Sequence, residues 1–138
     1  MDEPVISRKV LLADDSELGF ELVDSALRSR GHYVDWARNG AEALARIQNR
    51  RYDLLLLDLH MPRMDGFQVA AAIREDASVS DLRIVVLTAD NMPGVREELL
   101  AVGVREYVTK PFNVDYLIEL VERPEASPIP VLGAVEAT

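Results

Sequence analysis

Short apolar runs alternate with amphipathic segments along most of this chain. Five runs are rich in strand-forming residues, at 9–13, 33–37, 53–58, 83–87 and 105–109. A segment with helical spacing of apolar residues follows each run, at 17–30, 41–49, 67–75, 93–102 and 114–122. Repeated strand-then-helix units require right-handed crossovers between parallel strands. We therefore predict a doubly wound α/β fold of the (βα)5 type, with helices on both faces of the sheet.

The character of each run predicts its place in the sheet. The runs 9–13, 53–58 and 83–87 are almost continuously apolar, as expected for parallel strands covered on both faces. The run 33–37 alternates instead, with an aspartate between Val34 and Trp36, which is typical of an edge strand. The predicted order is 2-1-3-4-5. Ligands of such sheets bind beyond the carboxyl ends of the strands, at the point between strands 1 and 3 where the order reverses.

The helical segments carry recognisable boundaries. Asp15 or Ser16 can cap the first helix, Gly31 can end it, and Asn113 can cap the last. We predict that the buried stripe of the first helix consists of Leu18, Leu22, Ala26 and Leu27.

Length and composition limit the classes of function. The chain has 138 residues, no cysteine and a net charge of −9, which disfavours direct binding to nucleic acid. No segment resembles a secretory signal or a membrane span, so we expect a cytoplasmic protein without membrane contact. Three prolines follow within 124–130. We expect one domain over 1–123 and a linker or tail over 124–138. The chain could be a stand-alone protein, the alternative we favour, or a part excised from a longer protein at the proline-rich tail.

Three carboxylates are expected to meet at the carboxyl edge of the sheet. Asp14 and Asp15 follow the first strand, and Asp58 ends the third. Like charges a few ångströms apart raise one another's pKa values, and a hard divalent cation such as Mg²⁺ resolves this conflict. Asp14 and Asp15 could instead serve only as a helix cap. The neighbouring strand ends favour the metal, because Thr88 adds a hydroxyl and Lys110 an ammonium, the groups that hold a phosphoryl group.

These motifs together resemble the receiver domain of bacterial response regulators, the chemotaxis-Y-like proteins of two-component signalling. The matching segments are LLADDS, LLLLDLHMPRMDG, VVLTAD and YVTKPF, and the resemblance covers about 9–122. It implies a flavodoxin-like fold in which Asp58 is the phosphoacceptor. It also implies that Asp15, Asp58 and the main-chain carbonyl of His60 ligate Mg²⁺, while Asp14 acts mostly through metal-bound water.

The resemblance assigns further roles. Lys110 would pair with the acceptor and then with the phosphoryl oxygens, and the Lys110–Pro111 bond would be cis. Thr88 and Tyr107 would form the switch, in which Tyr107 fills the space that Thr88 vacates on phosphorylation. His60 and Asp90 depart from the commonest pattern and would tune the lifetime of the phosphoryl group.

The implied function is a signalling switch and not an enzyme with an external substrate, although such a domain promotes its own phosphorylation and dephosphorylation. The expected phosphodonor is a histidine kinase or a histidine phosphotransfer protein. The expected output surface, formed by 93–102, 105–109 and 114–122, would control a partner protein, and a phosphorylation-dependent homodimer is compatible with it. Three alternatives stay open: a degenerate receiver that binds partners without phosphate, a flavodoxin-like cofactor binder, and a haloacid-dehalogenase-type phosphatase.

Overall fold

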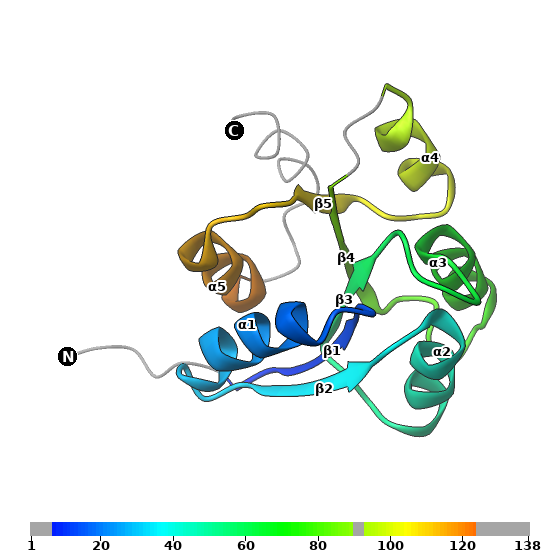
Figure 1. Ribbon diagram of the computed structural model, residues 1–138. Helices are drawn as coiled ribbons and strands as arrows, with labels where there is room; N and C mark the ends of the chain where they lie inside the picture. The colour runs from blue at the N-terminus through cyan, green and yellow to red at the C-terminus, as the bar shows by residue number, and fades with distance from the viewer. Residues whose placement is uncertain (1–6, 90–92, 124–138) are drawn as a thin grey trace.

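A computed structural model describes residues 7–89 and 93–123, and it confirms the predicted alternation of strands and helices (Figure 1). The strands are β1 (Lys9–Ala13), β2 (Tyr33–Ala37), β3 (Leu54–Asp58), β4 (Arg83–Thr88) and β5 (Glu106–Thr109). The helices are α1 (Glu17–Arg28), α2 (Gly40–Asn49), α3 (Gly66–Glu75), α4 (Val95–Ala101) and α5 (Val114–Glu122). Asp90 and the predicted tail at 124–138 lie outside the described residues.

The strands form one parallel sheet in the predicted order, β2-β1-β3-β4-β5. The register brings the ends of the strands level with one another. Asp58 at the end of β3 lies beside Leu87 of β4, and Thr88 lies beside Thr109 of β5. The side chains that follow the strands therefore gather at one edge of the sheet.

Each central strand supplies side chains to two separate cores. Figure 1 shows α1 and α5 on one face of the sheet and α2, α3 and α4 on the other. In β3, Leu54 and Leu56 pack with α1 and α5, whereas Leu55 and Leu57 pack with the other three helices. All four leucines are at most 1% exposed, which explains why this run shows no polar alternation.

The predicted buried stripe of α1 is wrong in part. Leu18 is 78% exposed and Leu22 is 50% exposed, whereas Val23 and Leu27 are buried. The segment carries apolar side chains on two faces, and the sheet can cover one of them. The stripe that contains Val23 and Leu27 faces the sheet because it fits between β1, β2 and α5.

Side chains cap several helices, as the sequence indicates. Ser16 accepts a hydrogen bond from the backbone of α1, and Asn113 accepts two from α5. Asp65 forms a capping box with Gln68 at the start of α3. The first helix ends at Arg28, earlier than predicted, and Gly31 lies in the following turn with a positive φ of 89°.

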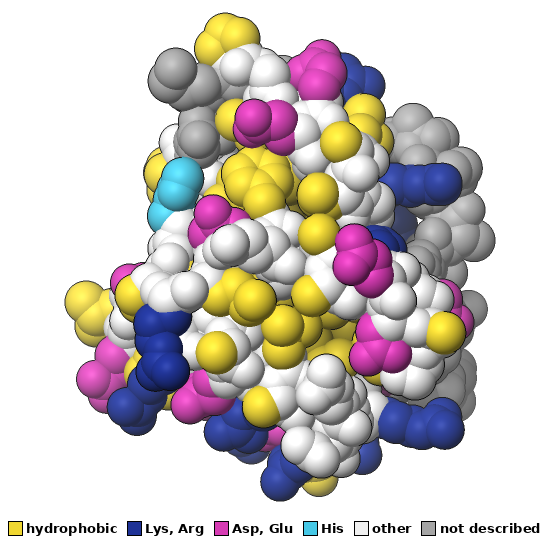
Figure 2. Space-filling view, turned by 90° about the vertical axis from the view of Figure 1, so that its right-hand side faces the viewer, with side chains coloured by type: hydrophobic (Ala, Val, Ile, Leu, Met, Phe, Trp, Pro, Cys, Tyr) yellow, Lys and Arg dark blue, Asp and Glu magenta, His cyan; other side chains and the backbone are white. Residues whose placement is uncertain are grey.

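The helices close off the faces of the sheet. Figure 2 looks onto the side covered by α2, α3 and α4, where hydrophobic side chains lie along the middle and charged side chains of both signs surround them. Each described helix is too short or too polar to cross a lipid bilayer. With both faces covered by helices, the side chains at the strand ends gather at the edges of the sheet and not on its faces.

Candidate functional site

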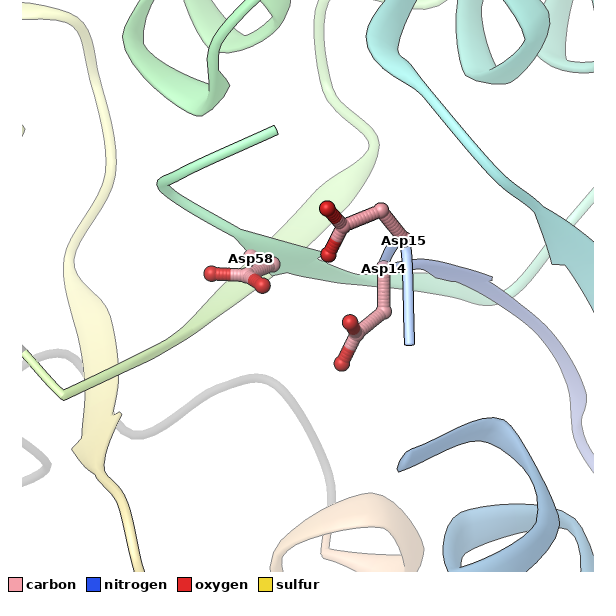
Figure 3. Close-up of side chains that lie close together, drawn as sticks. All are labelled: Asp14, Asp15 and Asp58. Carbon is pink, nitrogen blue, oxygen red and sulfur yellow. The ribbon is translucent and has the colours of Figure 1, made fainter. Parts of the chain in front are cut away.

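Three carboxylates meet at the carboxyl edge of the sheet. Asp14 and Asp15 directly follow β1, Asp58 ends β3, and these strands are hydrogen-bonded neighbours. One carboxylate oxygen of each residue lies within 4.8 Å of the others (Figure 3). The structure thus brings together the three acidic residues predicted to form the site.

The electrostatics of this cluster favour a cation. Asp58 is 8% exposed and Asp14 is 3% exposed, whereas Asp15 is open to solvent. Burial raises the pKa of Asp58; Lys110 and the backbone N–H of His60 oppose this shift, and the charge of Asp14 adds to it. The Lys110 ammonium lies 3.3 Å from Asp14 Oδ2 and 3.5 Å from Asp58 Oδ2. One ammonium cannot neutralise three carboxylates, and the oxygen donors suit a hard divalent metal.

The main chain of Asp14 is anchored at both of its polar groups. Its N–H donates to the carbonyl of Ala37 at 3.1 Å, and its carbonyl accepts from the indole Nε1 of Trp36 at 2.7 Å. Its side-chain Oδ1 accepts from the backbone N–H of Ser16 at 2.9 Å. Sequence reasoning missed Trp36, because an indole that contacts a main-chain carbonyl belongs to no motif. The signal that could have indicated Trp36 was its position near the end of the strand predicted to lie beside the first strand.

The other predicted residues lie around this cluster at different depths. Thr88 is fully buried at the end of β4, and its carbonyl accepts from Lys110 N at 2.7 Å. The Lys110–Pro111 bond is cis, the isomer that the resemblance implied. The His60 side chain is exposed, and its backbone N–H donates to Asp58 Oδ1 at 3.1 Å. Tyr107 is half-buried in β5 and packs against the core under α3 and α4, outside the acidic cluster.

The loop between β3 and α3 is held against Asp58. Leu59 is fully buried, and its carbonyl accepts from the N–H of Gly66 at 2.9 Å. A Cβ atom on Gly66 would lie 2.7 Å from the main-chain oxygen of Asp58, so a side chain here would push the loop away. Arg63 adopts a positive φ of 73°, a strained conformation that no sequence signal indicated.

A large cavity lies at the opposite end of the sheet. Its volume is about 780 Å³, and it is lined at the strand starts by Lys9, Asp53 and Arg83. Ligands of doubly wound sheets bind at the other edge, beyond the carboxyl ends. The cavity also mixes acidic and basic groups, and it does not touch the acidic cluster.

Comparison with known proteins agrees with this geometry. The family model described as a response regulator receiver domain matches residues 10–122. Among curated proteins, the chain is 32% identical to a probable histidine kinase 1 from Oryza sativa subsp. indica, over 83% of this chain and 15% of that protein. It is 29% identical to the polar-differentiation response regulator DivK of Brucella anthropi, over 83% of this chain and 94% of that protein. The chain therefore spans a small part of the kinase and nearly all of the response regulator.

Two solved structures illustrate the likeness in three dimensions. The chemotaxis response regulator CheY4 of Vibrio cholerae is 35% identical in sequence and superposes with a TM-score of 0.79. The match covers 86% of this chain and 98% of that chain. The receiver domain of the sensor histidine kinase PA1611 from Pseudomonas aeruginosa is 30% identical, with a TM-score of 0.78, 86% of this chain and 97% of that chain covered. A magnesium ion is coordinated in the active-site cleft of the PA1611 domain.

Proposed function

Because the chain belongs to the response regulator receiver domain family, we propose that it is a phosphorylation-dependent switch in which Asp58 accepts a phosphoryl group. The observation that carries this proposal is the position of Asp58, at a strand end within reach of two more carboxylates and one ammonium. The family acts in signalling and not in metabolism. We accordingly assign the chain no external substrate, and its catalysis is confined to its own phosphorylation and dephosphorylation.

In the proposed reaction, a carboxylate oxygen of Asp58 attacks the phosphorus of a phosphohistidine. An O–P bond forms as the P–N bond breaks, and the imidazole leaves with the electron pair of that bond. The N–H of His60 donates to Asp58 Oδ1 and the ammonium of Lys110 donates to Oδ2, so these two donors orient the carboxylate for the attack. Lys110 then neutralises part of the charge that the phosphoryl oxygens bring to the site.

The proposal includes Mg²⁺ as cofactor. Asp15, Asp58 and the main-chain carbonyl of His60 would hold it directly, and Asp14 would act through metal-bound water. When bound, the ion would offset the negative charge of the phosphoryl oxygens. The fit rests on the donor set, since one oxygen from each of three carboxylates lies within 4.8 Å of the others, and Lys110 is the ammonium that pairs with them among the described residues.

The proposed switch couples Thr88 to Tyr107. Thr88 ends β4 beside Lys110, and its hydroxyl would turn toward the new phosphoryl oxygens. Tyr107 lies in β5 against the core beneath α4, so its ring would move inward as Thr88 moves away. The face formed by α4, β5 and α5 would then change by a population shift between two packings. His60, exposed next to Asp58, would tune the lifetime of the phosphoryl group, as would Asp90.

We propose a histidine kinase or a histidine phosphotransfer protein as phosphodonor, and a partner protein that reads the α4–β5–α5 face. The proposal includes a cytoplasmic location and allows a homodimer that forms on phosphorylation. It includes no direct contact with nucleic acid, because the net charge of −9 would repel phosphate backbones.

The test is phosphorylation by a small acyl-phosphate donor in the presence of Mg²⁺. Intact-protein mass spectrometry should detect the gain of one phosphoryl group in the wild-type chain, and no gain after Asp58→Asn or in excess chelator. Asp24→Asn is the matched control, because it removes a carboxylate on α1 that pairs with Arg28 and is not part of the cluster. A wild-type chain that gains no phosphoryl group would contradict the proposal and favour a receiver that binds its partner without phosphate.

A further inference from the structure

We infer that Trp36 is a positioning residue that sets the geometry of the metal-binding acid pair through the main chain of Asp14. The inference rests on the proposed function. Trp36 lies near the end of β2, at the edge of the sheet beside β1 (Figure 1). Its indole N–H donates to the carbonyl of Asp14 at 2.7 Å, a short and therefore well-formed hydrogen bond.

This bond fixes the peptide unit that joins the two acidic residues. The carbonyl of Asp14 and the N–H of Asp15 share one planar peptide group, so an anchor on the carbonyl also fixes the direction in which Asp15 begins. The N–H of Asp14 is anchored separately, on the carbonyl of Ala37. The end of β2 therefore holds Asp14 at both main-chain groups. These bonds fix the orientation of the peptide plane that leads into Asp15.

Two neighbouring side chains hold the indole in place, one from α1 and one from the turn after β2. The ring of Phe20 on α1 stacks on it, with centroids 4.9 Å apart and planes 7° from parallel. The guanidinium of Arg38 lies over the ring, 4.7 Å from its centroid. Because Phe20 belongs to the helix that follows the acid pair, the stack ties the start of α1 to the same strand that anchors Asp14. Such support limits the freedom of the N–H donor.

Among the described residues, the Asp15 side chain makes no hydrogen bond of its own, so its orientation depends on the main chain that precedes it. Asp15 is exposed, whereas the Asp14 side chain is buried and bonded to Ser16 and Lys110. Groups that orient metal ligands from outside the coordination shell affect metal affinity even though they do not touch the ion. Trp36 is placed to have this effect on Asp15, and it makes no contribution to the charge of the site.

The test compares Trp36→Phe with Tyr33→Phe. Phenylalanine at 36 keeps a stacking ring and removes the N–H, while Tyr33 on the same strand is 61% exposed and serves as the matched control. Titration calorimetry should show Mg²⁺ affinity weakened about two- to tenfold in Trp36→Phe, as expected for the loss of one supporting hydrogen bond, and unchanged in Tyr33→Phe. The rate of phosphorylation in Trp36→Phe should return to the wild-type value at saturating Mg²⁺, which a general packing defect would not allow.

A second measurement needs no substitution. The chain has one tryptophan, so its indole N–H gives a single signal in a ¹⁵N–¹H spectrum. That signal should be protected from solvent exchange and should move when Mg²⁺ is added. The inference would be overturned by an indole signal that exchanges with solvent and does not shift when Mg²⁺ is added. Equal Mg²⁺ affinity in Trp36→Phe and the wild type would also overturn it. A wild-type chain that binds no Mg²⁺ would overturn the proposed function instead, so the two failures are distinguishable.

Discussion

The environment of the Asp58 carboxylate disfavours its charged form. Its side chain is almost fully buried, burial raises its pKa, and the charge of Asp14 adds to the effect. Lys110 compensates in part, but it is shared between both carboxylates. A buried carboxylate near another carboxylate lowers the stability of the protein, a cost in keeping with the role proposed for Asp58.

We therefore expect Asp58→Asn to stabilise the protein when no divalent metal is present. Removal of one buried charge of nearly unchanged shape should raise the free energy of unfolding by roughly 1 kcal/mol, the ordinary size of a single-site effect. Urea unfolding in the presence of a chelator measures the difference. Asp24→Asn, on the surface of α1, should not give this gain. An Asp58→Asn protein less stable than the wild type under these conditions would show that the burial of Asp58 is already fully compensated.

The strands β4 and β5 and the helix α5 are joined by one buried ion pair. Arg83 Nε and Nη2 lie 2.6 and 2.8 Å from the two carboxylate oxygens of Glu106. Arg83 also donates to the main-chain carbonyls of Leu120 and Arg123 at the end of α5. This pair sits at the start of the two strands whose other ends carry Thr88 and Lys110. It therefore braces the elements proposed to form the output face.

Breaking this pair from one side should be costly. Arg83→Met leaves the carboxylate of Glu106 buried without a partner, and we expect a loss of about 3–5 kcal/mol in the free energy of unfolding. The double variant Arg83→Met/Glu106→Met removes both charges and should recover the part of that loss that comes from the unpaired carboxylate, although the carbonyls of Leu120 and Arg123 still lose the Arg83 donor. Denaturant unfolding of Arg83→Met, of Glu106→Met and of the double variant completes the cycle. Hydrogen exchange should also show α5 opening more readily in Arg83→Met. Additive losses in the double variant would contradict the pairing.

The two ends of the described chain are joined across the molecule by Glu122. Its carboxylate accepts two hydrogen bonds from Arg30 at 2.9 Å, and it lies 2.9 Å from Nε2 of His32. Nδ1 of His32 accepts from the backbone N–H of Arg8. A network of four residues thus links the entry to β1, the turn after α1 and the end of α5.

Because of this network, the free energy of unfolding should depend on pH in the acidic range. The Arg30 hydrogen bonds are the main cause that lowers the pKa of Glu122 from 4.5 to about 2. A carboxyl group with a lowered pKa contributes its stabilisation fully above pH 4.5, and loses it as the pH falls from 4.5 toward 2. Glu122→Gln should therefore flatten the decline in the free energy of unfolding over this range. Glu119→Gln on the same helix makes the same change in charge and serves as control. Identical acid profiles for the two variants would contradict this role of Glu122.

Much of the fold followed from local sequence. The five strands, their order and the capping roles of Ser16 and Asn113 could be predicted, because strand runs and caps depend on residues close together in the chain. The convergence of Asp14, Asp15 and Asp58 also followed, since the carboxyl ends of adjacent parallel strands must meet at one edge of the sheet.

Other features were decided by tertiary packing. The sequence of α1 offers two apolar stripes, and contact with the sheet and α5 selected the one with Val23 and Leu27 while leaving Leu18 and Leu22 exposed. The bond from Trp36 to Asp14 joins residues 22 positions apart, and the Arg83–Glu106 pair joins residues 23 apart. Local periodicity carries no information about partners at such separations. Pattern along the chain therefore determined which elements form and which acids meet, whereas three-dimensional proximity decided which side chains support them.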